Sequence, residues 1–327
     1  MGTTVLVVGA GAVGARAARH LLADEAVDTV LVADANRKRR TAVVAALSPR
    51  AIAVDEPDVS AAELVVVATP ANRQVDLVRH AVSEGRHVVS VADSVATVKH
   101  LLDLDAEARE RGVTVALGAG FSPGLSCLLA CHAAADFDVV EEIHVAKQGT
   151  GGPACARQHH AALRSTGLDW RDHAWRRRSP GSGRELSFFP DPIGGADCYR
   201  ASLPDGLLLV PAFPGVERVT ARLAATRRDR FTASLPMLRR PHTEGRIGGL
   251  RVEVRGQRNG SSDTVVLGAV DRPAVAAGTV AGQVARWIAA GKVTTRGAAG
   301  LAGLVEPLPF LRELARSGVR AAIFEGA

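Results

Sequence analysis

The stretch VLVVGAGAVG at residues 5–14 decides the fold of this chain. Its first four residues form an apolar run that a glycine ends, which is typical of a buried strand in a parallel sheet. The glycines are spaced as G-x-G-x-x-G, and residues 15–23 favour a helix. Gly9 suits the tight turn, Gly11 lets a pyrophosphate approach the backbone, and Gly14 lets the helix pack closely on the strand. Because a helix N-terminus offers free N–H groups to phosphates, the stretch predicts a dinucleotide site.

A second buried strand at residues 29–33 ends at Asp34, twenty residues after Gly14. An acidic residue at this spacing hydrogen-bonds the ribose hydroxyls of the adenosine. Its charge would repel a 2′-phosphate and so favours NAD. The polar run at residues 36–38 can instead grip a 2′-phosphate, so NADP stays open as the cofactor.

Further apolar strands at residues 64–68, 87–91 and 113–117 alternate with helical segments at residues 74–84 and 95–111. This alternation predicts a doubly wound parallel sheet, whose ligands bind beyond the carboxyl ends of the strands. The residues expected to bind the cofactor are Gly9, Gly11, Ala12, Val13, Gly14, Asp34, Ala35, Arg37, Ala68, Thr69, Pro70, Ala92 and Phe121.

The segment GAGFSPG at residues 118–124 is expected to leave the first domain near the nicotinamide end of the cofactor. Ser122 suits a helix N-cap and Pro123 a first helical position. Beyond it, a strand, a glycine-rich turn at residues 148–153 and a helix are expected. Later strands are expected at residues 207–210, 216–221, 249–256 and 262–270, and the Asn-Gly pair between the last two predicts a hairpin.

The helix at residues 274–290 is rich in Ala and Gly, which predicts close packing back onto the first domain. The expected architecture is therefore α/β: a Rossmann domain from residues 1–124 and 275–327, with an inserted α+β substrate domain at residues 125–274. The inserted domain is expected to carry a largely antiparallel sheet, which also suits the surface of a homodimer.

The Rossmann start, the Gly-x-Gly-Phe-x-Pro-Gly-Leu junction at residues 118–125 and the tail at residues 307–325 resemble the saccharopine dehydrogenase-like family. That group includes saccharopine reductases and carboxynorspermidine dehydrogenase, and diaminopimelate dehydrogenase has a related layout. The resemblance implies NAD(P)-dependent hydride transfer at an amino or imino carbon of an amino-acid-like substrate. Many relatives carry an acidic residue before the junction proline, where this chain has Ser122.

The glycine-rich turn also resembles the substrate-binding Gly-Gly turn of that family. Backbone N–H groups of Gly151 and Gly152 are expected to hold a carboxylate, with help from Arg157, although the segment could be a plain strand–turn–helix link. The reaction also needs a proton donor near the substrate nitrogen. The candidates are Lys147, His159, His160, Asp93, Tyr199 and His242, of which Lys147 and His160 rank first because they flank the turn.

The cysteines carry no disulfide signature. Cys127 and Cys131 share one helix face by their i, i+4 spacing, as do Cys155 and His159. These four residues could form a zinc site only if the two helices met, and buried thiols in apolar helices are far commoner, so no metal is expected.

The net charge of +6 comes from arginine clusters without interleaved aromatic residues, which argues against nucleic-acid binding. We find no apolar run of membrane-spanning length, so a cytoplasmic protein without a membrane partner is expected. Two alternatives stay open beside the implied activity: a homoserine or aldehyde dehydrogenase-like oxidoreductase, and a protein that senses the dinucleotide without turnover.

Overall fold

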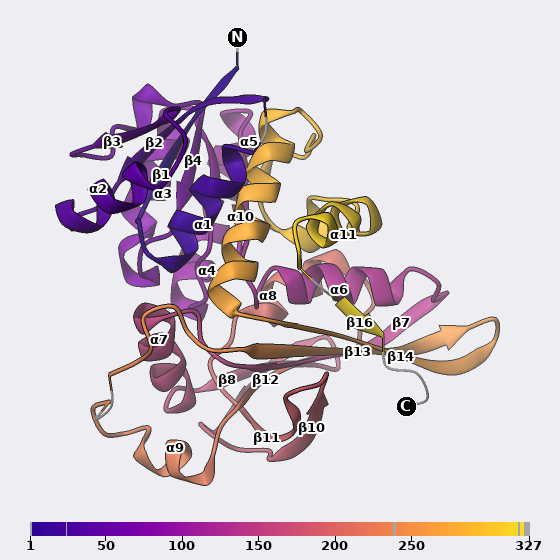
Figure 1. The fold of residues 1–327 in the computed structure, drawn as a ribbon. Coiled ribbons are helices and arrows are strands. Elements are labelled where there is room, and N and C mark those ends of the chain that lie inside the picture. Colours follow the sequence, from indigo (N-terminus) through magenta and orange to yellow (C-terminus); the bar gives the residue numbers. More distant parts are fainter. Residues whose placement is uncertain (1, 24, 238–239, 320, 324–327) are drawn as a thin grey trace.

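The computed structural model describes residues 2–23, 25–237, 240–319 and 321–323. Two sheets lie one above the other, and the first sheet and its helices form the upper half in Figure 1. Helices α6 (Leu125–Ala134) and α8 (Asp205–Leu209) lie between the two halves. Among the described residues, no helix is long and apolar enough to cross a membrane.

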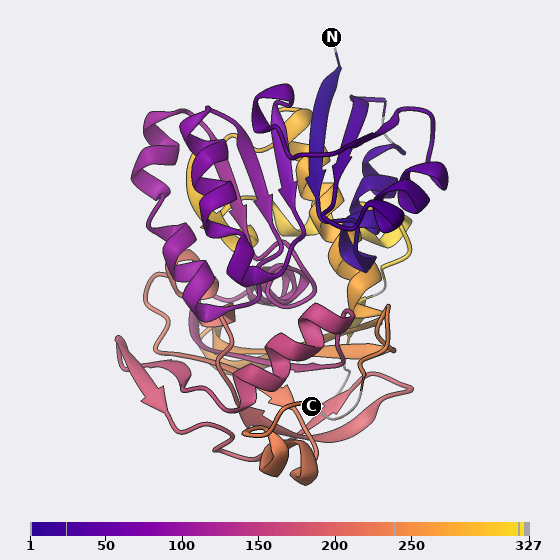
Figure 2. The same cartoon turned by 90° about the vertical axis from the view of Figure 1, so that its left-hand side faces the viewer.

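The first sheet is parallel throughout its seven strands. Helices lie on both of its faces, and in Figure 2 some are in front of the strands and others behind them. The strand order is β15 (Gly297–Gly300), β6 (Thr114–Leu117), β5 (His87–Ser90), β4 (Leu64–Val67), β1 (Thr3–Val8), β2 (Val27–Ala33) and β3 (Ala51–Val54). The helices are α1 (Ala12–Leu21), α2 (Arg37–Ala45), α3 (Val75–Ser83), α4 (Val95–Leu102), α5 (Asp105–Glu110), α10 (Pro273–Ala289) and α11 (Pro307–Arg316).

The returning helix α10 packs against α1, as its small residues predict. A Cβ on Gly278 would lie 2.5 Å from the carbonyl oxygen of Val13, and one on Gly282 would lie 2.9 Å from Cβ of His20. These glycines allow the two helices to approach more closely than larger residues would. After α10, strand β15 joins the first sheet, whereas β16 (Ala321–Ile323) pairs with the second sheet.

The second sheet is mostly antiparallel, with one parallel pairing between β7 and β12. Its strands are β7 (Val139–Gln148), β8 (Gly167–Arg171), β9 (Ala174–Arg178), β10 (Glu185–Phe189), β11 (Gly194–Arg200), β12 (Arg218–Ala224), β13 (Gly248–Arg258), β14 (Ser261–Asp271) and β16. Asn259 and Gly260 both have positive φ, at 50° and 75°, as the predicted tight hairpin between β13 and β14 requires. Helices α7 (Pro153–Leu163) and α9 (Arg227–Thr232) complete this half.

One expected strand is wrong: residues 205–209 form α8, which ends in a short 3-10 turn. The apolar run there is buried all round, and period alone does not separate a buried helix from a buried strand. The α/β class with a parallel sheet and a largely antiparallel one is confirmed.

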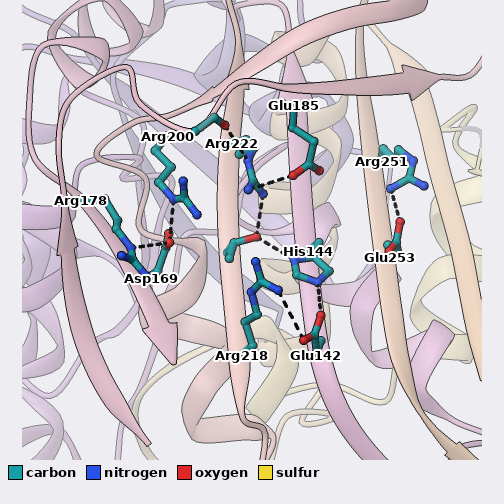
Figure 3. Close-up of polar contacts among 12 residues, drawn as sticks. Glu142, His144, Asp169, Arg178, Glu185, Arg200, Arg218, Arg222, Arg251 and Glu253 are labelled. Carbon is teal, nitrogen blue, oxygen red and sulfur yellow. Dashed lines mark hydrogen bonds and ion pairs between the residues drawn. The ribbon is translucent and has the colours of Figure 1, made fainter. Parts of the chain in front are cut away.

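The far face of the second sheet, turned away from α6, is polar and charged. Figure 3 shows its paired groups: Glu142 with His144 and Arg218, Glu185 with Arg222, and Glu253 with Arg251. Strand β10 curls over this face, where Phe189 packs with Ala146 and Cys198. The charged pairs and this small buried apolar cluster therefore lie on the same face of the sheet.

Candidate active site

The glycine turn has the geometry that its sequence predicts. Gly9 has a φ of +107°, which a side chain rarely adopts. A Cβ on Gly14 would lie 1.7 Å from the carbonyl oxygen of Gly9, so only glycine lets the turn close there. A Cβ on Gly11 would meet nothing within 4 Å, which leaves space for a bound group beside the start of α1.

Asp34 follows β2 and has its carboxylate almost fully engaged. Its oxygens accept the backbone N–H groups of Ala10 and Asn36, both at 2.7 Å, and Arg39 grips the same carboxylate at 2.6 Å and 3.1 Å. Burial alone would raise the pKa of Asp34, but hydrogen bonds from Arg39, Asn36 and Ala10 outweigh it and lower that pKa below its ordinary value. Asp34 is therefore ionised and paired, while the side chain of Arg39 stays half exposed at 51%.

A cavity of about 1170 Å³ runs from this turn towards the second domain. Most of the residues expected to bind the cofactor line it, together with Arg39: Gly9, Gly11, Ala12, Val13, Asp34, Ala35, Ala68, Thr69, Pro70 and Phe121. Gly14 lies beneath the turn, and Arg37 and Ala92 lie outside the lining. The residues expected to bind substrate, Gly151, Gly152 and Arg157, line the cavity as well.

Four polar side chains meet in the second-domain part of this cavity. Lys147 is 2% exposed, and its Nζ donates a 2.9 Å hydrogen bond to the carbonyl oxygen of Ser122. Sγ of Cys155 lies 3.5 Å from Nε2 of His159, and Oδ2 of Asp93 lies 3.9 Å from the same nitrogen. Strand β7, helix α7 and the segment after β5 thus bring together side chains that are far apart in the sequence.

Burial and mutual charge set the protonation of this cluster. Burial raises the pKa of Asp93, and the nearby Lys147 charge offsets this only in part. Burial and the Lys147 charge hold the pKa of His159 well below its ordinary value, so its imidazole is neutral at pH 7. Burial, reinforced by Asp93, raises the pKa of Cys155 to about 12 and keeps it a thiol. The cluster therefore holds a cation, a carboxyl group that keeps its proton more readily than usual, and a neutral base.

The junction loop is supported from below by a buried carboxylate. Ser122 and Ser126 donate hydrogen bonds of 2.8 and 2.6 Å to Oδ1 of Asp205, which is 0% exposed. Helix α6 begins at Leu125 with Gly124 as its N-cap, so Ser122 is not the cap that its sequence position suggested. Where the resembling family carries an acidic residue, this chain places a serine that is hydrogen-bonded to a carboxylate from α8.

The other candidate proton donors lie outside the lining of the cavity. Nε2 of His160 is 2.7 Å from the carbonyl oxygen of Leu235, Tyr199 is buried beneath the guanidinium of Arg230, and His242 accepts the N–H of Glu244. Sequence reasoning ranked Lys147 and His160 first because they flank the glycine-rich turn at residues 148–153, and helical spacing alone did not show which histidine faces the cavity. It did not find Asp205 or Arg39 at all, since neither stands in a motif.

The parallel sheet, the glycine turn and the cavity at the carboxyl ends of the strands define the class of nicotinamide dinucleotide-binding oxidoreductase folds. Residues 5–116 match the family described as "Saccharopine dehydrogenase NADP binding domain". The resemblance of the first domain to this family, which the sequence predicted, is confirmed.

Solved structures share the fold over nearly the whole chain. Apo saccharopine dehydrogenase (L-Glu forming) from Saccharomyces cerevisiae superposes with a TM-score of 0.71 at 16% identity, covering 99% of this chain and 100% of the other. A meso-DAP dehydrogenase mutant with DAP from Clostridium tetani gives 0.52 at 14% identity, covering 96% and 99%. An engineered D-amino acid dehydrogenase bound to NADP+ gives 0.51 at 16%, covering 97% and 99%. Together with the family match, these likenesses support an NAD(P)-dependent oxidoreductase.

Proposed function

We propose that this chain catalyses NAD(P)-dependent hydride transfer at an amino or imino carbon of an amino-acid-like substrate. The observation that carries the proposal is the position of Lys147. A buried ammonium from the second domain faces the same cavity as the Gly9–Gly14 turn of the first domain, beside Asp93 and His159. A protein that only sensed the dinucleotide would have no need of such a cluster there.

The start of α7 supports a carboxylate-bearing substrate. Gly152 has a φ of +115° and immediately precedes Pro153, the first residue of the helix, and both line the cavity. The free N–H groups and positive dipole end of a helix N-terminus stabilise an anion. Arg157 lies one turn further along the same helix and can add a bidentate contact.

The dinucleotide, when bound, would supply or accept the hydride. The chain must then hold the substrate nitrogen and move its proton. Lys147 has one of its three N–H groups fixed on Ser122, and the other two are available to a substrate nitrogen or carboxylate. Asp93 retains a proton more readily than a free carboxyl group, and neutral His159 can accept one. We assign proton transfer to Lys147 and Asp93, with His159 as the relay.

One observation favours an aldehyde dehydrogenase-like reaction as the second candidate. The thiol of Cys155 contacts the imidazole of His159 at 3.5 Å inside the cavity, and a cysteine paired with a base can attack an aldehyde carbon. The pKa of Cys155, raised to about 12, speaks against a ready thiolate. This reaction therefore ranks below the first.

For the cofactor, we propose NADP(H). Asp34 alone favours NAD, but Arg39 neutralises its carboxylate and occupies the acceptor positions that a ribose hydroxyl would use. The half-exposed guanidinium can also pair with a 2′-phosphate.

We further propose a homodimer formed through the far face of the second sheet. Arginine and glutamate side chains alternate there. The arginines of one copy can therefore pair with the glutamates of a second copy related by a twofold axis. Leu186 and Phe188 of β10 add apolar surface beside them, at 57% and 59% exposure.

The function is tested by assaying NADPH and NADH oxidation with α-keto acids plus amines or ammonium, and NADP+ and NAD+ reduction with a matched panel of aldehydes. Lys147→Met keeps the length of the side chain and removes its charge. We expect kcat to fall by about 10²-fold or more while dinucleotide fluorescence still reports binding. Lys99→Met, on the exposed face of α4, is the matched control.

Unchanged turnover in Lys147→Met would refute the role of Lys147. Because a buried variant can lose its fold, Asp93→Asn is measured beside it, with the pH dependence of kcat/KM as its readout. Reduction of NADP+ or NAD+ with aldehydes alone, abolished in Cys155→Ser, would favour the second candidate. Binding of dinucleotide without turnover in either panel would favour a sensor.

A further inference from the structure

Three side chains of the active-site cluster have the composition and spacing of a metal site. Asp93, Cys155 and His159 each point one ligand atom at the others, and these atoms all lie within 4.8 Å of one another. Cys155 and His159 come from successive turns of α7, and Asp93 comes from the segment after β5. The sequence suggested that Cys155 and His159 would need Cys127 and Cys131 as partners, whereas the structure gives them a carboxylate instead.

We propose that Asp93, Cys155 and His159 bind a divalent transition-metal ion of the zinc class. Thiolate, imidazole and carboxylate are the three ligand types that zinc takes in proteins. Zinc–ligand bonds of about 2.0–2.3 Å at tetrahedral angles place neighbouring ligand atoms about 3.4–3.6 Å apart. The Cys155–His159 distance of 3.5 Å already fits, and the Asp93–His159 distance of 3.9 Å needs only a small rotation of the carboxylate.

The three ligands leave one coordination position open. All three line the cavity, so the fourth position faces the space where the substrate would lie. Three protein ligands with an open fourth position are typical of zinc sites that bind water or a small molecule, whereas structural sites are closed by four protein ligands. The ion would therefore be accessible both to solvent and to an amine or carboxylate in the cavity.

The charges around the cluster allow the ion. A divalent cation is balanced by the carboxylate of Asp93 and the thiolate of Cys155. Two further charged groups that act on Asp93, Lys147 and Asp205, have opposite signs.

Binding must displace the proton of the Cys155 thiol, so affinity is expected to rise with pH. The ion would also take up the lone pair of His159 and the carboxylate of Asp93, which our proposed function uses for proton transfer. Where that function holds, the loaded protein should be inhibited. The binding measurement itself does not depend on turnover, so the two proposals can fail separately.

The test is titration of the metal-free protein with Co²⁺, followed by its absorption, and then competition with Zn²⁺. We expect one Co²⁺ per chain, with a thiolate-to-metal charge-transfer band and the intense visible bands of a four-coordinate ion, both lost on adding Zn²⁺. In Cys155→Ser the charge-transfer band should disappear. In His159→Gln the dissociation constant for Co²⁺ should rise by at least about tenfold. Even the loss of a residue that only hydrogen-bonds to a metal ligand weakens metal binding by that much.

Two controls lie on α7, beside two of the proposed ligands, and on α6, where the sequence had suggested further ligands. His160→Gln changes the neighbouring histidine, and Cys131→Ser changes a cysteine that contacts the carbonyl oxygen of Ala302 instead. Both should bind Co²⁺ as the unaltered protein does. Asp93→Asn gives a third ligand variant should either α7 variant fail to fold. Weak Co²⁺ binding without a charge-transfer band, or equal binding in the ligand variants and the controls, would overturn the proposal.

Discussion

Nζ of Lys147 donates a 2.9 Å hydrogen bond to the carbonyl oxygen of Ser122, so a buried ammonium of the second domain is held by the loop that leaves the first. The hydroxyl of that serine in turn donates to Asp205. The position of Lys147 in the cavity therefore depends on a carboxylate from α8, which itself does not line the cavity.

Asp205 should stabilise the fold through the oxygen that both serines share. Asp205→Ala leaves the hydroxyls of Ser122 and Ser126 buried without this acceptor and should lower the free energy of unfolding by about 1–3 kcal/mol per lost partner. Asp205→Asn keeps Oδ1 and should unfold within about 1 kcal/mol of the unaltered protein. Urea unfolding measures both, and equal losses in the two variants would contradict this role.

The glycines of the first turn should separate folding from cofactor binding. Gly14→Ala places a Cβ 1.7 Å from the backbone oxygen of Gly9 and should destabilise the protein by about 1–3 kcal/mol or more. Gly11→Ala meets no protein atom within 4 Å, so it should melt normally yet bind dinucleotide more weakly. Thermal melting and NADPH fluorescence distinguish the two. Normal NADPH affinity in Gly11→Ala would show that no cofactor group lies beside that residue.

Arg39 should set the cofactor preference. Arg39→Ala removes the guanidinium proposed to hold the 2′-phosphate, so KM for NADPH should rise about tenfold or more, as expected for a lost charged hydrogen bond. KM for NADH should change little, because Asp34 then becomes free to accept a ribose hydroxyl. Arg79→Ala, an exposed arginine on α3, is the charge-matched control. A parallel loss with both cofactors would argue against the preference.

His159 should make the protein sensitive to acid. Its pKa in the folded state lies well below the ordinary value of 6.5, so the unfolded chain binds more protons between those two values. The stability contributed by neutral His159 is therefore complete above pH 6.5 and is lost as the pH falls towards the folded pKa. The slope from this one group is at most about 1.4 kcal/mol per pH unit.

The pH dependence is measured by urea unfolding of His159→Gln beside His160→Gln. We expect the His159 variant to lose less stability than the unaltered protein between pH 6.5 and 5, and the His160 variant to behave like the unaltered protein. Asp93, Cys155 and Lys147 face His159 and are present in all three, so the comparison isolates the imidazole. Identical slopes in the three proteins would contradict the prediction.

The far face of the second sheet should control self-association. Leu186→Asp with Phe188→Asp places two charges on its exposed apolar part and should shift sedimentation from dimer to monomer. Ile52→Asp, an equally exposed apolar residue on β3, is the control for surface charge. A monomer in the unaltered protein at micromolar concentration would contradict the proposed dimer.

The first domain could be predicted from local sequence because its signals are local. A glycine at positive φ, an apolar run that ends at it and an acidic residue after the next strand each act within a few residues of the chain. The Asn259–Gly260 hairpin and the small residues that bring α10 close to α1 are local signals of the same kind. Propensity and period could not settle α8, because a short run that is buried on every side carries neither helical nor strand period.

The active site was decided by the tertiary structure. The sequence alone indicated a dinucleotide site, a second domain and Lys147 as a candidate, but it ranked His160 above His159 and did not place Asp93 beside them. Those choices depend on how α7 is rotated and on which loop of the first sheet it meets, and such contacts between distant segments leave no periodic signal in the chain. The pairing of Arg39 with Asp34 and of Ser122 with Asp205 has the same origin, because a buried carboxylate takes whichever donors the packing brings to it.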